Sequence, residues 1–176
     1  MSDVLRMTTE YIESEDRLRV SCEMRTGETA VLWLTQRLFL RVLPHLVEWL
    51  DAHTPGIADA QASRARADTV QGFVQQAARA GLAPQAPVPP MSAHQIWLVH
   101  TVDLTARDGE VQLTLRPLAR DSAAAAFTLQ PQALRQWLGV LCEQFARAGW
   151  PMTAWPEWLH PRPAEDAREP ASSVVH

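Results

Sequence analysis

The sequence predicts an α+β fold in which an antiparallel sheet of about five strands carries two long amphipathic helices. Residues 17–24 alternate between polar and apolar side chains, which is typical of a half-buried strand. Residues 36–53 and 131–148 repeat apolar side chains at intervals of three and four, as amphipathic helices do. Asp108-Gly109 lies between two alternating runs, and this dipeptide is typical of a tight β-hairpin.

Composition narrows the class of protein. The chain has 176 residues, 47% of them hydrophobic, so it can bury one sizeable core. No apolar run reaches the roughly 18 residues of a membrane-spanning helix, and we expect a cytoplasmic protein because no secretory leader is visible. All 16 basic residues are arginine, which excludes lysine-based Schiff-base chemistry and the lysine of a phosphate-binding loop. The net charge of −4 makes nucleic acid an unlikely partner.

The first half of the expected domain covers about residues 12–81. A turn at 25–28 joins the strand at 17–24 to an inner strand at 29–34, whose side chains are apolar on both faces. Thr35 is expected to cap the following helix. Pro44 lies inside that helix and should kink it or break it in two.

An extra helix is expected over residues 62–80. Its narrow apolar stripe predicts the buried face, and Gly81 should end it. The stripe consists of Val70, Phe73, Val74, Ala77 and Ala78. Residues 83–90 are rich in proline and should form an extended connector to the second half.

The second half covers about residues 94–160. It begins with a strand from 95 to about 105, followed by the Asp108-Gly109 turn of type I′. If Arg107 faces Glu110, apolar residues face each other along the hairpin, Leu104 with Leu113 and Val102 with Leu115, so this register is self-consistent.

A strand at 123–129 and a helix from Pro131 to 148 complete this half, with the proline well placed in the first helical turn. The apolar stripe of this helix predicts its buried face: Leu134, Trp137, Leu138, Leu141, Cys142 and Phe145. We expect residues 1–160 to form a single domain. Residues 161–176 have few apolar side chains and should form a disordered tail.

The two halves resemble each other as ββα-like units. A shift of 95 residues places Leu18 on Leu113 and Leu34 on Leu129. Two explanations remain open, an internal duplication and the apolar spacing that any two ββα units share. Both predict a related architecture in the two halves.

Few residues point to catalysis. The chain has no metal-ligand spacing, no glycine-rich phosphate loop and no nucleophile elbow, so no catalytic residue, metal or cofactor is nominated. Cys22 and Cys142 form no CxxC pair and are expected to be small core residues. The hairpin register places His100 on the face of Val102, so it should point toward the apolar side. With Trp97 it defines a candidate pocket, although a core histidine bonded to a carbonyl fits the same pattern.

Tryptophan is the clearest excess, with seven residues against one tyrosine. Trp150, Trp155 and Trp158, with Leu159, lie in one short stretch interrupted by prolines. Tryptophan is enriched where proteins bind each other, so these four residues are the predicted partner-binding site. The same stretch could instead cover the protein's own core. It could also stack on nucleic-acid bases, although the acidic net charge disfavours this alternative.

The expected function is that of a non-catalytic protein-interaction module. An assembly factor, an adaptor or a chaperone-like accessory protein would each fit, with either a protein partner or self-association as a homodimer. The alternative is a small-ligand-binding protein or an enzyme, with a pocket between sheet and helices near His100. Nucleic-acid binding has only the arginines of residues 64–79 in its favour, and a solvated helix face explains these arginines more simply.

Overall fold

The computed structural model describes residues 2–57, 64–119 and 124–160, and it is an α+β fold. Within these ranges, seven strands form one mixed sheet in the order β4-β3-β2-β1-β7-β6-β5, with three α-helices. The strands are β1 (Ser2–Ile12), β2 (Arg17–Met24), β3 (Thr29–Leu34), β4 (Gln95–Leu98), β5 (Thr101–Arg107), β6 (Glu110–Arg116) and β7 (Ala125–Leu129). The helices are α1 (Gln36–Ala52), α2 (Arg64–Ala80) and α3 (Pro131–Arg147). None of these helices is both long and apolar enough to span a membrane.

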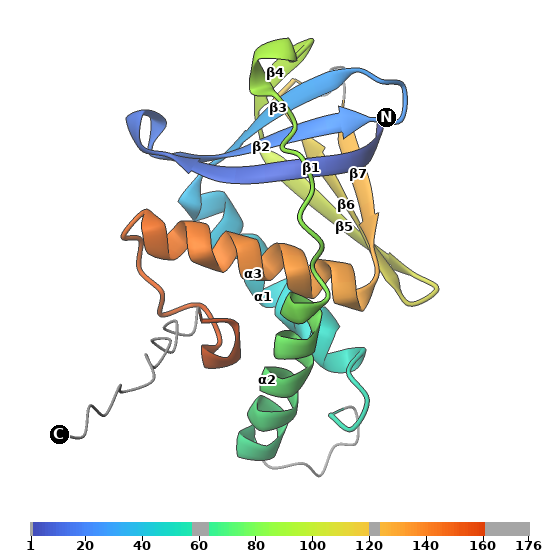
Figure 1. Cartoon of the computed structure of the whole chain (residues 1–176), viewed down its shortest axis with the longest axis vertical. Coiled ribbons are helices and arrows are strands. Elements are labelled where there is room, and N and C mark those ends of the chain that lie inside the picture. The colour runs from blue at the N-terminus through green and yellow to red at the C-terminus, as the bar shows by residue number, and fades with distance from the viewer. Residues whose placement is uncertain (1, 58–63, 120–123, 161–176) are drawn as a thin grey trace, which may run out of the picture.

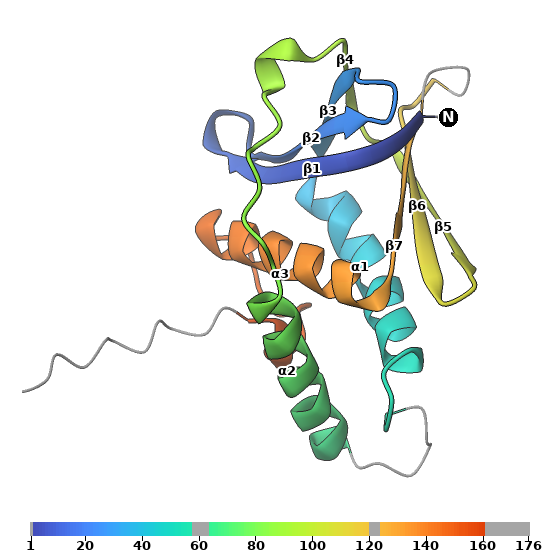
Figure 2. The ribbon, with the colours of Figure 1, turned by 45° about the vertical axis from the view of Figure 1, so that its right-hand side comes forward.

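The sheet is strongly curled. β4 and β5 lie at its opposite edges, yet only Val99 and His100 separate them in the chain. The Val99 N–H donates to the carbonyl of Trp33 on β3 at 2.9 Å, and the His100 N–H donates to the carbonyl of Arg116 on β6 at 2.8 Å. The chain therefore passes directly from one edge of the sheet to the other. Figures 1 and 2 show the result, with β1, β2 and β3 crossing over the layer of β5, β6 and β7.

This topology corrects the expected sheet of about five antiparallel strands. Two pairings are parallel, β1 with β7 through Ser2 and Asp3, and β3 with β4. The first half contributes three strands before α1 and the second half contributes four strands before α3, so neither half is a ββα unit as expected. The sequence pattern does not reveal β1, because its apolar residues do not alternate. It also does not separate β4 from β5, because the crossing between them is only two residues long.

The local predictions of the second half agree with the structure. β5 and β6 pair as expected, Arg107 with Glu110, Leu104 with Leu113 and Val102 with Leu115. Asp108 and Gly109 both have positive φ, 51° and 77°, as a type I′ turn requires. The predicted start of β7 at residue 123 and the predicted tail at 161–176 lie outside the described residues.

The helix predictions also largely hold. Thr35 caps α1 through its hydroxyl, which accepts the Leu38 N–H at 3.2 Å. Pro44 lies within α1 without dividing it, which corrects the expected break. All six stripe residues of α3 are buried. The main core therefore lies between the curled sheet and the two helices α1 and α3.

α2 buries only part of the predicted stripe. Ala78 is buried as predicted, but Phe73 is 70% exposed, and the polar residues Gln71 and Gln75 are buried instead. The reason is that α2 packs against polar groups of α3. The Gln75 amide donates to the carbonyl of Arg135 at 3.0 Å, and the Gln136 amide donates to the carbonyl of Ala78 at 2.9 Å.

The proline-rich connector runs across the outside of β1, as Figure 1 shows. The Val88 N–H donates to the Thr8 hydroxyl at 2.9 Å, and the Val88 side chain is buried. Arg6 adds a hydrogen bond to the Ala86 carbonyl at 2.7 Å. The connector thus covers part of the sheet face that points away from the helices.

Substitutions of Leu46 and Leu141 test the assigned helix faces. Both leucines are fully buried in the core. We expect Leu46→Ala and Leu141→Ala each to lower the free energy of unfolding by about 2–5 kcal/mol, because each change removes buried methyl groups and leaves a cavity. Chemical denaturation measures the loss. A loss below about 1 kcal/mol at both positions would contradict the assigned faces.

A substitution at Gly109 tests the hairpin. Gly109→Val should destabilise the protein, because a β-branched residue is strained at positive φ. Glu110→Gln next to it should change the free energy of unfolding very little, since it keeps the side-chain length and the β conformation. Equal denaturation curves for the two variants would argue against the turn.

Candidate functional site

A groove of about 500 Å³ lies between α1 and the β5–β6 hairpin. Its lining is mostly apolar and comes from only these two parts of the fold, whose arrangement can be followed in Figure 2. From α1 come His45, Glu48, Trp49 and Ala52, and from the hairpin come Val102, Leu104, Ala106 and Val111. The α1 residues lie three and four positions apart, which places them on one side of the helix.

β5 presents free backbone groups beside this groove. A two-residue hairpin joins Arg107 and Glu110 through both of their backbone hydrogen bonds, so every second residue of β5 bonds to β6. The N–H and C=O groups of Val102, Leu104 and Ala106 therefore point to the outer edge. No other described residue bonds to these groups. The same three residues turn their side chains into the groove, so backbone edge and apolar groove form one continuous surface.

This edge lacks three of the usual protections, and its only charged residues are Asp103 and Arg107. Natural edge strands are typically short, bulged or interrupted by proline. β4, at the other edge of the sheet, has only four residues. β5 has seven residues, an unbroken register and no proline. It is therefore the edge on which a further strand can be added.

β1 also has a strand edge beside a helix, and in contrast to β5 this edge is covered. There α3 covers the strand: the Gln144 side chain accepts the Tyr11 N–H at 2.9 Å, and the Trp137 indole donates to the Thr9 hydroxyl at 3.1 Å. α1 makes no such hydrogen bond to β5 within the described chain. At the groove, α1 therefore leaves the edge of β5 uncovered.

The opposite face of β5 carries charge. Asp103 accepts a hydrogen bond from Arg116 on β6 at 2.7 Å in an exposed ion pair, and Arg107 is exposed near the end of the strand. An incoming strand would therefore meet apolar side chains on the groove face and both signs of charge on the other.

Most of the predicted tryptophan site belongs to the core. Trp150 and Leu159 are buried, and Trp155 is only 4% exposed. The Trp155 ring stacks on Phe39 with 5.7 Å between centroids and meets Phe145 edge-on at 5.1 Å. The segment 150–160 folds back because these aromatic rings of α1 and α3 need a cover. Of the four predicted partner-binding residues, only Trp158 stays partly exposed.

Trp158 covers a buried arginine. The guanidinium carbon of Arg135 lies 5.2 Å from the Trp158 ring centre, and Arg135 is only 1% exposed. Its Nη2 donates to the Thr54 hydroxyl at 2.7 Å and to the Gln71 side chain, whose amide in turn donates to Asp51. Burial lowers the pKa of Arg135 to about 10, with Asp51 acting in the opposite direction, so the group is charged at neutral pH.

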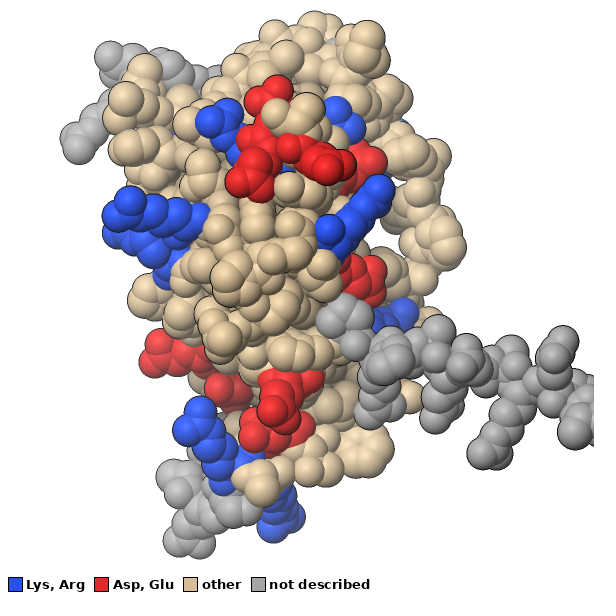
Figure 3. Space-filling view, turned by 90° about the vertical axis from the view of Figure 1, so that its left-hand side faces the viewer, with Lys and Arg blue, Asp and Glu red and all other residues tan. Residues whose placement is uncertain are grey.

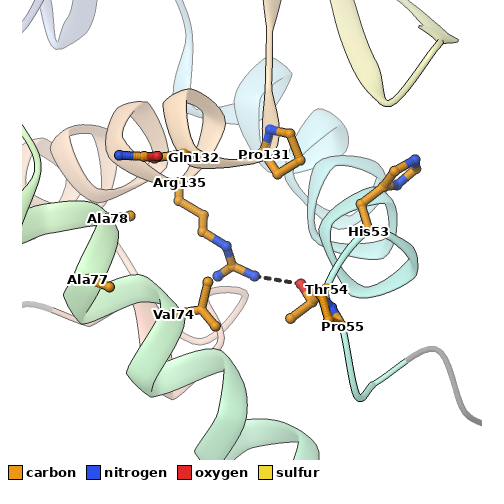
Figure 4. Close-up of a pocket in the computed structure, with 9 residues that line it drawn as sticks. All are labelled: His53, Thr54, Pro55, Val74, Ala77, Ala78, Pro131, Gln132 and Arg135. Carbon is orange, nitrogen blue, oxygen red and sulfur yellow. Dashed lines mark hydrogen bonds between the residues drawn. The ribbon is translucent and has the colours of Figure 1, made fainter.

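Arg135 therefore ties α3 to α2 and to the end of α1. It also lines a cavity of about 290 Å³ between these three helices, drawn in Figure 4. The acidic patches seen in Figure 3 lie on the surface and do not line this cavity. The cluster explains why α2 buries a polar face, a feature that apolar periodicity cannot reveal.

The two residues of the predicted pocket do not meet as expected. His100 is exposed, so the prediction that it points inward is wrong, and Trp97 is half-buried against the core. Val99 is the inward-facing residue, because the crossing between the two sheet edges changes the alternation. The histidine of the groove is His45, which the sequence could have offered through its spacing to Trp49 and Ala52 on one helix face.

Other groups with chemical potential are inaccessible or scattered. Burial raises the pKa of both cysteine thiols, Cys22 and Cys142, to about 12, so neither is an activated nucleophile. The described residues contain no group of three or more potential metal ligands. Comparisons with protein-family models, with curated proteins and with solved structures gave no match. The groove along β5 is accordingly the strongest candidate site in the described part of the chain.

Two substitutions separate the structural from the exposed tryptophan. Trp155→Ala should lower the free energy of unfolding by about 3–5 kcal/mol, because it removes a buried ring from the aromatic cluster. Trp158→Ala should cost about 0.5–2 kcal/mol, chiefly through the lost contact with Arg135. Urea denaturation of both variants measures the difference, and the opposite order would contradict the assigned burial.

Proposed function

We propose that this chain is a non-catalytic protein-interaction module that accepts an extended segment of a partner along β5. The partner segment hydrogen-bonds to the free backbone of Val102, Leu104 and Ala106, and every second side chain of it enters the groove beside Trp49. One observation carries the proposal: the same three residues offer both the unpaired backbone and the apolar lining. Strand addition of this kind obtains affinity from the backbone and specificity from alternate side chains.

The groove and the charges define the chemistry of this segment. It is an extended strand with apolar side chains at every second position, since the lining is mainly apolar. Its intervening residues are polar, with a basic group near Asp103 and an acidic group near Arg107, because these two charges lie on the opposite face of β5. An adaptor, assembly factor or chaperone-like protein would use such a surface.

The alternative of a ligand pocket or active site near His100 has less support. His100 is exposed and Trp97 packs on the core. The groove itself has a volume that a small molecule could fill. Its titratable lining residues, His45 and Glu48, both come from α1, whereas the free backbone edge of β5 specifically fits a peptide.

A backbone variant tests strand addition directly. The probe is a capped peptide of about seven residues in which valines alternate with threonines, with an arginine at one end and an aspartate at the other. Ala106→Pro should weaken its binding at least about tenfold, because proline removes an edge N–H and obstructs the incoming strand. Ala106→Ser is the matched control, since it keeps the N–H and should bind the peptide as the original chain does.

Hydrogen exchange locates the bound peptide. Binding should slow exchange at the amides of Val102, Leu104 and Ala106 and leave the β4 edge unchanged. The N–H of residue 106 points away from β6, so Ala106→Pro should keep the β5–β6 ladder intact. Peptide binding that is the same in both variants, or protection confined to another edge, would rule out the proposal.

A further inference from the structure

We infer that the strand that occupies the β5 edge is β5 of a second copy of this chain, paired antiparallel about a two-fold axis. This inference rests on the proposed function and names its partner. β5 itself has the required pattern: Val102, Leu104 and Ala106 are the apolar alternate residues, and Asp103 and Arg107 supply both signs of charge on the other face. A surface that carries its own complement can form a closed dimer.

Hydrogen-bonding geometry limits the registers. Within β5, Val102, Leu104 and Ala106 direct backbone groups outward, so the pairing must align these alternate positions with those of the second copy. In the register centred on Leu104, the two Leu104 residues face each other, and Val102 faces Ala106 of the second copy. All three residues of each chain then find a partner. Each larger valine also meets a smaller alanine.

Two other registers shift the strands along each other. A shift in one direction sets the two Asp103 carboxylates directly opposite each other, and like charges in this position are destabilising. A shift in the other direction pairs Leu104 with Ala106 and places Val102 opposite Asp108 in the turn. The second shift therefore keeps apolar residues opposite each other at the centre of the edge.

The charges decide between these registers. When Leu104 pairs with Ala106, Asp103 lies directly opposite Arg107 of the second copy, and opposite charges in this position are stabilising. The two-fold axis repeats this contact, so the dimer contains two Asp103–Arg107 pairs. Within one chain Arg107 has no ion pair among the described residues, so this guanidinium is available to the second copy.

The apolar face becomes continuous across the axis. A two-fold axis perpendicular to the sheet keeps both grooves on one side, so the groove side chains of the two copies lie next to each other. Leu104, half-exposed in the single chain, gains cover from Ala106 of the second copy. The dimer thereby protects the edge that the single chain leaves open.

A charge exchange between copies tests the inference on the full chain. Sedimentation equilibrium at about 100 µM should show the original chain as a dimer. Arg107→Asp should weaken the dimer about tenfold or more, because it brings aspartates of the two copies together, and Asp103→Arg should do the same with arginines. An equimolar mixture of the two variants should recover dimers, since each chain then meets opposite charges on the other.

Backbone variants provide the uncharged control. Ala106→Pro should yield monomers and Ala106→Ser should remain dimeric, with circular dichroism confirming that each is folded. A monomeric original chain at this concentration would overturn the inference, and so would a mixture of charge variants that associates no better than its components. If the chain is monomeric yet binds the valine–threonine peptide at β5, only the second copy as partner is wrong. If neither association occurs, the proposed function fails as well.

Discussion

Val99 and His100 carry the chain between opposite edges of the sheet, and much of the architecture follows from this short passage. Because two residues span only a few ångströms, the opposite edges of the sheet, β4 with its neighbour β3 and β5 with its neighbour β6, must lie close together there. The sheet can meet this requirement only by curling. The curl then encloses the apolar faces of both halves around α1 and α3. It also leaves the β5–β6 hairpin extending beside α1, which creates the groove.

The features that could be predicted from the sequence are those set by neighbouring residues. Alternation identified β2, the apolar stripe identified the buried face of α3, and Asp108-Gly109 defined the hairpin and its register. Each of these depends on chemistry within a few positions. The missed features depend on distant partners: β1 joins β7 from the other end of the chain, and β4 separates from β5 because it pairs with β3. Periodicity carries no information about such pairings.

The candidate site was likewise predicted only in part from the sequence. The sequence correctly placed Val102 and Leu104 on one face of β5, yet it could not show that α1 would face them at a distance. The tryptophan excess pointed toward partners, but the core uses Trp150 and Trp155 to cover Phe39 and Phe145. Arg135 is a second residue whose burial could not be predicted from its residue type. A residue type that is mostly exposed in proteins lies here inside a junction of three helices.

The pairing of β1 with β7 has a consequence for how the chain acquires its structure. β1 finds its neighbour β7 only after more than a hundred further residues have been made. The connector that links the halves also lies across β1 through Val88. Cleavage within residues 83–90 would therefore not release two autonomous units, because each fragment would lack strands that complete its part of the sheet. The halves are similar in order, but they mature together as one cooperative body.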